Sequence, residues 1–349
     1  MARFLKRAAV VLAVALVVGL GLFFGLIDHF PLAATPRPRA ALPAEIDARL
    51  RCDPAFPLSV TLDAEIAISG HRVIPGHIAV KRTDMEPFDT HFQLWLADGT
   101  TAPAPTLVVT PILGGENEVE EIIADDLASH GMHAVIVDRR LPKDPAFASF
   151  ETALRDMVAT RRRVIDWLET RPEVDAKRIG AYGVSLGGIT TAMLAAVEPR
   201  LRANIVVMAG GDFATVLSRS VEGEAGILRR AEGLPEAPSA ETLTAFIARG
   251  RSILETCPLA LAPYADPASI LLFTTRRDTS VPSDTQLRLR EALGEPETIS
   301  LPTGHYSAII YLKLIESRAR AFLARRFELP GSEAAARPET PAAGRRAGS

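Results

Sequence analysis

The sequence predicts an α/β fold in which a mostly parallel sheet is flanked by helices. Short apolar runs, such as residues 106–110 and 134–137, are typical of strands that are buried on both faces. They alternate with longer segments of helical period, such as residues 151–170, and this alternation indicates βαβ units with right-handed crossovers. With 48% hydrophobic and 23% charged residues in 349, the chain has the composition of a folded protein, and its formal charge of −3 argues against a nucleic-acid partner.

The elements can be predicted in chain order. Residues 58–69 and 77–96, separated by Gly70 and Pro75-Gly76, indicate an antiparallel beginning. Parallel strands are expected at residues 106–110, 134–137, 178–182, 204–208, 270–275 and 298–301. Helices are expected at residues 117–130, 151–170, 186–197 and 307–327. The first of these helices begins with Asn117 and Glu120, which are spaced as in a capping box.

The segment between the strands at 204–208 and 270–275 is too long for a single crossover. Residues 227–231 and 242–254 within it have helical patterns. We therefore expect an insert at about residues 212–265 that forms a small helical cap over the sheet edge.

The N-terminus has the pattern of a membrane anchor. Residues 8–27 carry no charge, and a helix of about 20 residues crosses a hydrocarbon core of about 30 Å. Three positive charges precede this run and the next is Arg37, so the positive-inside rule predicts an extracytoplasmic domain, on the periplasmic side of the inner membrane in a Gram-negative bacterium. Secretion after cleavage near Leu32-Ala33-Ala34 is the alternative.

These patterns divide the chain into four parts. Residues 1–34 are assigned to the anchor and the start of a linker, and residues 35–57 to the rest of the linker and an entry segment. Residues 58–329 form the predicted folded domain, and residues 330–349 have the composition of a disordered tail.

A candidate nucleophile lies between a predicted strand and a predicted helix. The run Gly183-Val184-Ser185-Leu186-Gly187-Gly188 follows the strand at 178–182 and opens the helix at 186–197, which is the context of a nucleophile elbow. A serine hydroxyl needs a base, and on this type of fold the acid and then the histidine follow the serine in sequence. His305 is the only histidine after Ser185, and it lies in the loop between the last strand and the closing helix.

Four aspartates after Ser185 could supply the acid. Asp278 follows the buried run at 270–275, so it is predicted at the carboxyl end of a strand and is favoured. Asp212 follows the preceding strand and remains the alternative. Asp266 and Asp284 are expected to cap helices or turns.

Over about residues 100–327 the sequence resembles the α/β-hydrolase superfamily, especially dienelactone-hydrolase-like esterases and prolyl-oligopeptidase-type catalytic domains. The resemblance rests on Val164-Ile165-Asp166-Trp167-Leu168, Arg171-Pro172-Glu173-Val174-Asp175, Arg178-Ile179-Gly180, the elbow at 183–188, the segment 278–282 and Gly304-His305-Tyr306. It implies that Ser185 is the nucleophile, that His305 acts as base and then as acid, and that Asp278 orients His305.

The resemblance also implies an oxyanion hole built from two backbone N–H groups. One belongs to Leu186, and the other comes from the loop after the strand at 106–110. In that loop Pro111-Ile112 replaces the His-Gly of many relatives, and aligning the two pairs points to Leu113, with Ile112 as the alternative. Because both donors are backbone groups, the side-chain change leaves them in place.

Other polar residues have simpler interpretations. Arg139-Arg140 and Arg276-Arg277 could bind a substrate carboxylate or phosphate, or could be solvated or paired locally. Arg161-Arg162-Arg163 is expected on a solvated helix face, and Glu116, Glu118, Glu120 and Glu121 suit a helix N-terminus.

The sequence contains no pattern for a cofactor or a metal, so neither is expected. Cys52 and Cys257 are the only cysteines. In an extracytoplasmic domain they could form a disulfide, and two free buried thiols are equally compatible with the sequence.

Together these patterns predict a serine hydrolase that cleaves a carboxylic ester, or a related acyl bond, of a small molecule through an acyl-enzyme. A peptidase or thioesterase of the same fold is the first alternative. A non-catalytic, membrane-anchored binding protein is the second, and the sequence makes no prediction of the oligomeric state.

Overall fold

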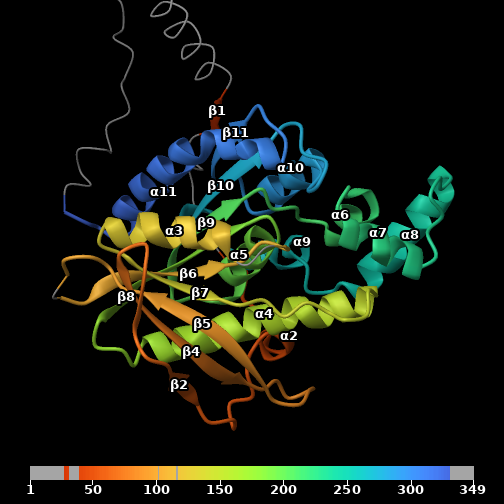
Figure 1. Ribbon diagram of the computed structural model, residues 1–349. Coiled ribbons are helices and arrows are strands. Elements are labelled where there is room, and N and C mark those ends of the chain that lie inside the picture. The colour runs from red at the N-terminus through yellow and green to blue at the C-terminus, as the bar shows by residue number, and fades with distance from the viewer. Residues whose placement is uncertain (1–26, 31–38, 101, 115–116, 331–349) are drawn as a thin grey trace, which may run out of the picture.

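The computed structural model describes residues 27–30, 39–100, 102–114 and 117–330. Within them, eleven strands form one sheet, and helices pack on both of its faces (Figure 1). The strands are β1 (Asp28–Phe30), β2 (Val60–Leu62), β3 (Ile66–Ile68), β4 (His71–Val80), β5 (Phe88–Trp95), β6 (Ala104–Thr110), β7 (His133–Val137), β8 (Val174–Val184), β9 (Leu201–Val207), β10 (Ile270–Thr275) and β11 (Glu297–Leu301). The predicted fold class is confirmed.

The helices connect these strands and cover them. They are α2 (Ala44–Arg49), α3 (Glu118–Ser129), α4 (Phe147–Leu168), α5 (Leu186–Val197), α6 (Phe213–Arg219), α7 (Gly223–Ala231), α8 (Ala240–Ile253), α9 (Pro258–Leu261), α10 (Ser283–Ala292) and α11 (Leu312–Arg326), with short 3₁₀ turns η1 (Ala262–Tyr264), η2 (Pro267–Ser269) and η3 (Tyr306–Tyr311).

The parallel strands bury side chains on both faces, as their continuous apolar runs predict. In β6, Val108 packs into the core shared with α4 and α5, whereas its neighbours Leu107 and Val109 pack into the core shared with α3 and α11. This alternation follows from the two-residue period of a strand. Figure 1 shows α3 and α11 lying along the same side of the parallel strands.

Strand β6 is the point at which the chain changes the side of the sheet to which it adds strands. The order is β1-β11-β10-β9-β8-β6-β7-β5-β4-β2, with β3 beside β4, so the chain goes from β6 to β7 on one side and then returns to β8 on the other. Strands β6, β8, β9, β10 and β11 are parallel neighbours in that sequence, and Thr110 at the end of β6 lies opposite Gly183 of β8. The loops after β6 and β8 therefore meet at the carboxyl edge, where open α/β sheets bind ligands.

The antiparallel region differs from its prediction at Pro75-Gly76. These residues were expected to separate two strands, but β4 runs through them and pairs with β5 from Val73↔Trp95 to Val80↔Phe88. The carbonyl of Pro75 accepts a hydrogen bond from the Asp63 N–H, 2.9 Å away, just beyond the end of β2 at Leu62. The side of Pro75 that lacks an N–H faces this gap between β2 and β3, so proline costs no sheet hydrogen bond there. The predicted strand over 77–96 is interrupted between Val80 and Phe88.

The folded unit begins before the predicted boundary at residue 58. Strand β1 pairs antiparallel with β11, Asp28 lying opposite Ser300, and Leu50 and Cys52 are buried in the core. The predicted anchor over residues 8–27 lies outside the described residues except for Ile27, and so does the tail from residue 331. In the part of the chain that is described, none of the helices combines the length and the apolar character needed to span a bilayer.

The predicted helical insert is present between β9 and β10. Helices α6, α7 and α8 project beyond the sheet on the right of Figure 1, and α9, η1 and η2 bring the chain back to β10. Helix α10 was not predicted, because it has few apolar positions.

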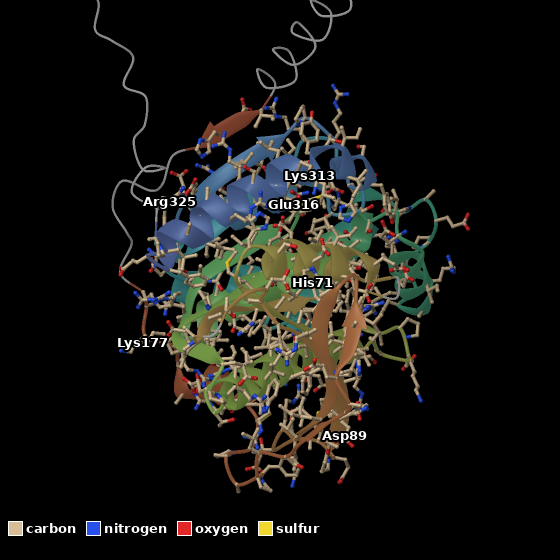
Figure 2. The ribbon with its side chains drawn as sticks, turned by 60° about the vertical axis from the view of Figure 1, so that its left-hand side comes forward. His71, Asp89, Lys177, Lys313, Glu316 and Arg325 are labelled. Carbon is tan, nitrogen blue, oxygen red and sulfur yellow. The ribbon has the colours of Figure 1, made fainter. Side chains whose placement is uncertain are left out.

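The closing helix is shorter than predicted. Its first turns form η3, and α11 begins only at Leu312. Figure 2 shows Lys313, Glu316 and Arg325 along α11. The Lys313 and Glu316 side chains form an ion pair at 2.8 Å, and Arg325 pairs with Glu297 of β11 at 2.7 Å.

The three arginines of α4 are buried, so the prediction of a solvated face is wrong. Arg161 donates to the carbonyl oxygens of Val137 and Met157 and to the Thr110 hydroxyl. The other two guanidinium groups contact the N-terminal segment, where Arg162 pairs with Asp47 and Arg163 donates to the Phe56 carbonyl. Arg162 also pairs with Glu198, which follows α5. The N-terminal segment around Asp47 and Phe56 therefore covers the part of α4 at Arg162 and Arg163, which the sequence pattern predicts to be exposed.

The two cysteines are free, so the structure has the second of the two arrangements that the sequence left open, and not the disulfide. The Cys52 thiol lies 3.6 Å from the carbonyl oxygen of Ala159 in α4. Cys257 precedes α9, and Asp212 is among the charged groups that act on it. The two thiols therefore lie against different elements. Burial raises the pKa of both, which favours the protonated thiol.

Candidate active site

Ser185 occupies the sharp turn between β8 and α5. Its backbone has φ 56° and ψ −119°, a conformation that L-residues rarely adopt. Hydrogen bonds hold it on both sides, since its N–H donates to the Val207 carbonyl and its carbonyl accepts from the Ile189 N–H, each at 2.9 Å. The turn therefore presents the serine side chain at the end of the sheet while its backbone stays fixed.

The glycines around Ser185 allow the elements to approach closely. A Cβ on Gly183 would lie 2.1 Å from the Gly187 carbonyl oxygen, and a Cβ on Gly187 would lie 2.0 Å from the Thr110 carbonyl oxygen. No side chain fits in either place. The glycines of the predicted elbow thus bring the start of α5 directly against the end of β6.

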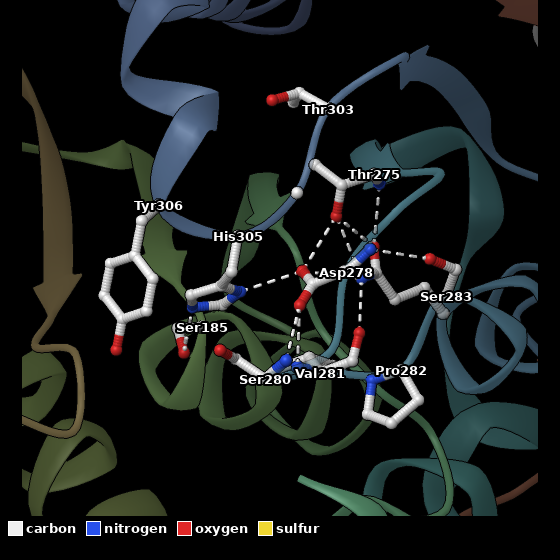
Figure 3. Close-up of polar contacts among 12 residues, drawn as sticks. Ser185, Thr275, Asp278, Ser280, Val281, Pro282, Ser283, Thr303, His305 and Tyr306 are labelled. Atoms are coloured by element: carbon white, nitrogen blue, oxygen red, sulfur yellow. Dashed lines mark hydrogen bonds and ion pairs between the residues drawn. The ribbon is translucent and has the colours of Figure 1, made fainter. Parts of the chain in front are cut away.

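His305 links Ser185 to Asp278. It lies between β11 and η3, with its Nε2 3.1 Å from the Ser185 Oγ and its Nδ1 2.8 Å from the Asp278 Oδ2 (Figure 3). The Asp278 side chain is fully buried, and the His305 side chain is 12% exposed. The structure thus brings together the three side chains that the sequence analysis selected.

The Asp278 carboxylate is held by several further donors. Its Oδ1 accepts from the N–H groups of Ser280 and Val281 at 2.9 and 2.8 Å. Its Oδ2 accepts from the Thr275 hydroxyl at 2.8 Å and from the Gln286 side-chain amide at 3.1 Å, beside His305 (Figure 3). These bonds stabilise a buried charge and fix the oxygen that faces the imidazole.

The alternative acid, Asp212, has other partners. It is the N-cap of α6, where it accepts from the N–H and hydroxyl of Thr215, and it also pairs with Arg251. Burial opposes its ionisation, but the hydrogen bonds from Arg251 and Thr215 outweigh this effect and lower its pKa. The partners of Asp212 are therefore Thr215 and Arg251, and His305 is not among them.

Of the remaining two aspartates, Asp266 caps η2 as expected, by accepting from the Ala268 N–H. Asp284 is not a cap: it lies in the first turn of α10, which Pro282 precedes, and it pairs with Arg219 at 2.7 Å.

The loop after β6 contains the predicted second oxyanion donor. Leu113 and Leu186 both line the cavity that Ser185 faces. The alternative donor, the Ile112 N–H, donates instead to the Glu120 carboxylate at 2.8 Å. The predicted capping box is absent because Asn117 has a left-handed φ of 73° and its side chain donates to Asp138, which leaves Glu120 to bind the loop.

A cavity of about 660 Å³ opens at Ser185 and His305. Its walls come mainly from apolar residues of the insert, the loop after β6, α3 and the segment after His305, including Leu113, Ile123, Phe150, Phe213, Val216, Leu217, Val281, Ile309 and Ile315. At its mouth the Tyr306 hydroxyl donates to the Glu222 carboxylate at 2.8 Å, joining the loop of His305 to the start of α7.

The four arginines considered for anion binding do not line this cavity in the described structure. Arg139 donates its Nε to the Leu113 carbonyl oxygen at 2.9 Å, and the Arg140 guanidinium lies 4.5 Å from the centre of the Phe88 ring. Arg276 pairs with Asp28, and Arg277 is exposed. The lining carries the carboxylates of Glu222 and Glu224 instead, so the structure favours the other interpretation of these arginines, local contacts or solvation.

Comparisons with known proteins agree with this architecture. Residues 88–250 match the profile of the family described as X-Pro dipeptidyl-peptidase (S15 family). No curated protein sequence matches the chain.

Several solved structures share the fold at low sequence identity. Acetyl xylan esterase 1 from Thermoanaerobacterium is 15% identical, with a TM-score of 0.56 over 79% of this chain and 94% of that one. An acetyl xylan esterase from Paenibacillus is 16% identical, with a TM-score of 0.53 over 79% and 99% of the two chains. An α/β hydrolase from Penicillium is 18% identical, with a TM-score of 0.50 over 78% and 100%. The chain therefore has the α/β-hydrolase fold.

Proposed function

We propose that this protein is a serine hydrolase that cleaves carboxylic esters with a large apolar group, using Ser185, His305 and Asp278 as its catalytic triad. The observation that carries the proposal is the continuous series of hydrogen bonds from Asp278 through His305 to Ser185 at the wall of an apolar cavity. Such a series activates a serine that is otherwise a poor nucleophile at neutral pH.

The first half of the reaction transfers the acyl group to the enzyme. His305 Nε2 takes the proton from the Ser185 hydroxyl while the Oγ attacks the ester carbonyl carbon, and the carbonyl oxygen becomes an alkoxide. The N–H groups of Leu186 and Leu113 are the proposed donors to that alkoxide. When the carbonyl re-forms, the bond to the alcohol oxygen breaks and His305 gives its proton to that oxygen, which releases the alcohol.

The second half uses water in place of the serine. His305 takes a proton from water while the water oxygen attacks the acyl carbon, and then returns the proton to Ser185 as the acid leaves. Asp278 holds the Nδ1–H tautomer and stabilises the imidazolium in both halves. No cofactor is needed for either step.

The cavity supports an apolar substrate. Most of its lining is aliphatic or aromatic, and the carboxylates of Glu222 and Glu224 in that lining would repel an acidic substrate. A volume of about 660 Å³ leaves room for a larger acyl or alcohol part than an acetyl group.

A second candidate is a peptidase, because the matching family profile is described as X-Pro dipeptidyl-peptidase. The esterase and the peptidase can be distinguished by measuring kcat/KM for p-nitrophenyl acetate, butyrate and octanoate and for Ala-Pro p-nitroanilide. The ester proposal predicts kcat/KM that rises from acetate to octanoate and exceeds that for the anilide. Efficient anilide hydrolysis with poor ester turnover would favour the peptidase instead.

A further inference from the structure

We propose that Glu120 and Arg139 are positioning residues that hold the loop after β6 so that the Leu113 N–H is directed at the oxyanion. This inference rests on the proposed function. It assigns a role to two charged side chains that the triad does not use.

The two side chains hold consecutive parts of the loop backbone. Glu120, on the first turn of α3, accepts the Ile112 N–H at 2.8 Å, and Arg139, after β7, donates to the Leu113 carbonyl oxygen at 2.9 Å. The Ile112 N–H belongs to the peptide unit before the one that carries the Leu113 N–H, and the Leu113 carbonyl belongs to the unit after it. With both flanking planes held, the central plane has little freedom to rotate.

The start of the loop is held as well. The buried guanidinium of Arg161 donates to the Thr110 hydroxyl, and the Gly187 position packs against the Thr110 carbonyl. The loop therefore leaves β6 from a fixed point, close to the turn that carries Ser185.

Glu120 is unusual because its carboxyl group is buried. The residue is 1% exposed, and its second carboxylate oxygen, Oε2, has no hydrogen-bond partner in the described structure. Burial also raises its pKa, against the opposing effects of the Ile112 N–H and of Arg139. A buried carboxyl group with an unpaired oxygen does not favour folding, and the contact with another segment that the structure gives this carboxyl group is the one with the loop.

The test measures hydrolysis of p-nitrophenyl butyrate by the full-length protein and by matched variants. Glu120→Leu removes the acceptor and keeps an apolar side chain of similar length, while Glu120→Gln keeps a carbonyl oxygen for the Ile112 N–H. Glu121→Leu, at the next position of α3, is the control for a change in helix charge.

Loss of a complete oxyanion donor lowers kcat by about 10²- to 10³-fold, so misplacement of one should cost about 10- to 100-fold. We expect Glu120→Leu to lower kcat by this amount with KM changed less than about threefold, and Glu120→Gln to regain most of the activity. The inhibition constant of a trifluoromethyl ketone, whose hemiketal alkoxide occupies the oxyanion hole, should rise in parallel with the fall in kcat.

Arg139→Met should have the same signature, with Arg140→Met as its control. The double variant Glu120→Leu/Arg139→Met should lose less than the product of the single losses, because both residues fix the same peptide unit.

An unchanged kcat in Glu120→Leu would overturn the inference. So would a loss matched by Glu121→Leu, or a loss that comes with a lower melting temperature and unchanged ketone affinity. Wild-type protein and Ser185→Ala are measured alongside: a wild type that is inactive and unlabelled by a fluorophosphonate would overturn the proposed function first, and this inference with it.

Discussion

Ser185 and His305 are residues whose sequence context is informative without a structure. The elbow positions require glycine because α5 contacts the end of β6 too closely to admit a side chain. His305 is the only histidine after Ser185. Both facts depend on local spacing or on chain order, so they can be read from one sequence. Asp278 was favoured by the same logic, because it follows a buried strand.

Other residues of the site could not be found in this way. Gln286 and Thr275 contact Asp278, and Glu120 contacts the Ile112 N–H, through side chains whose direction depends on the packed structure. The spacing of Asn117 and Glu120 indicated a capping box, but the left-handed backbone at Asn117 directs both side chains elsewhere. No local pattern distinguishes these residues from ordinary polar ones.

The first prediction compares the two candidate acids. Asp278→Asn should lower kcat for p-nitrophenyl butyrate by about 10⁴-fold, because an amide no longer favours the productive imidazole tautomer. Asp212→Asn should retain most of the kcat of the folded enzyme, since its partners are Thr215 and Arg251. Kinetics with far-UV circular dichroism as the folding control provide the comparison. If Asp278→Asn kept its activity and Asp212→Asn lost it, the catalytic acid would be Asp212, after β9, instead.

The second prediction concerns pH. Burial on α4 raises the pKa of Asp156 to about 6 from 3.8, although Arg82, 3.1 Å away, opposes the shift. Between about pH 4 and pH 6 the unfolded chain ionises this group while the folded protein keeps the proton, so the folded state loses stability as pH rises through that window. Asp156→Asn should not lose stability in this way, because asparagine does not titrate.

Urea unfolding from pH 4 to pH 8 measures this effect. The free energy of unfolding of Asp156→Asn, minus that of the wild type, should increase up to about pH 6 and then level off. A difference that does not vary with pH would contradict the assigned environment of Asp156.

At the scale of elements, buried strands were predicted best. Strands β6, β7, β10 and β11 are buried along their whole length because both faces of the sheet are covered, and the short apolar run in most of them could be recognised in the sequence. Elements with a mixed pattern were predicted less well: α10 has few apolar residues, and β4 contains Pro75, which in a sequence indicates the end of a strand. The arginines of α4 show the same limit, because the groups that they contact belong to other segments of the chain, β6 and β7 for Arg161 and the N-terminal segment for Arg162 and Arg163.

The third prediction tests the contact between α5 and β6. Gly187→Ala places a Cβ 2.0 Å from the Thr110 carbonyl oxygen, so it should displace the elbow and lower kcat at least 100-fold, beyond any effect on folding. The control is Gly226→Ala on α7, where the nearest atoms are flexible arginine ends at 3.6 Å. This variant should remain active and gain up to about 1 kcal/mol in stability from helix propensity. An active Gly187→Ala enzyme would show that the elbow does not depend on this approach.

At the scale of the molecule, the strand order and the insert together define the site. The change of side at β6 brings the loop after β6 beside the Ser185 turn, and the insert after β9 adds the apolar walls of the cavity. The sequence predicted the insert, from an over-long connection, and the alternation of strands and helices, but it made no prediction of the strand order. The volume and lining of the cavity depend on side-chain packing between distant segments, and they required the structure.

The fourth prediction is the membrane topology, which rests on the sequence alone. Residues 8–27 are expected to anchor the protein with its folded domain outside the cytoplasm. Alkaline phosphatase fused after Ala40 should be active, since it folds only where disulfides form, and β-galactosidase at the same position should be inactive. The opposite pair of results would contradict the topology.

The central claim is that Ser185 is the nucleophile of an acyl-enzyme, and its most direct test is intact-protein mass spectrometry after reaction with a fluorophosphonate probe. The account predicts one adduct per molecule of wild-type protein, mapped to the peptide containing Ser185, and a rate of labelling that falls by several orders of magnitude in His305→Ala. Ser185→Ala should take up no probe and hydrolyse no ester while keeping its fold. A Ser185→Ala protein that still hydrolyses p-nitrophenyl butyrate at the wild-type rate would contradict the account.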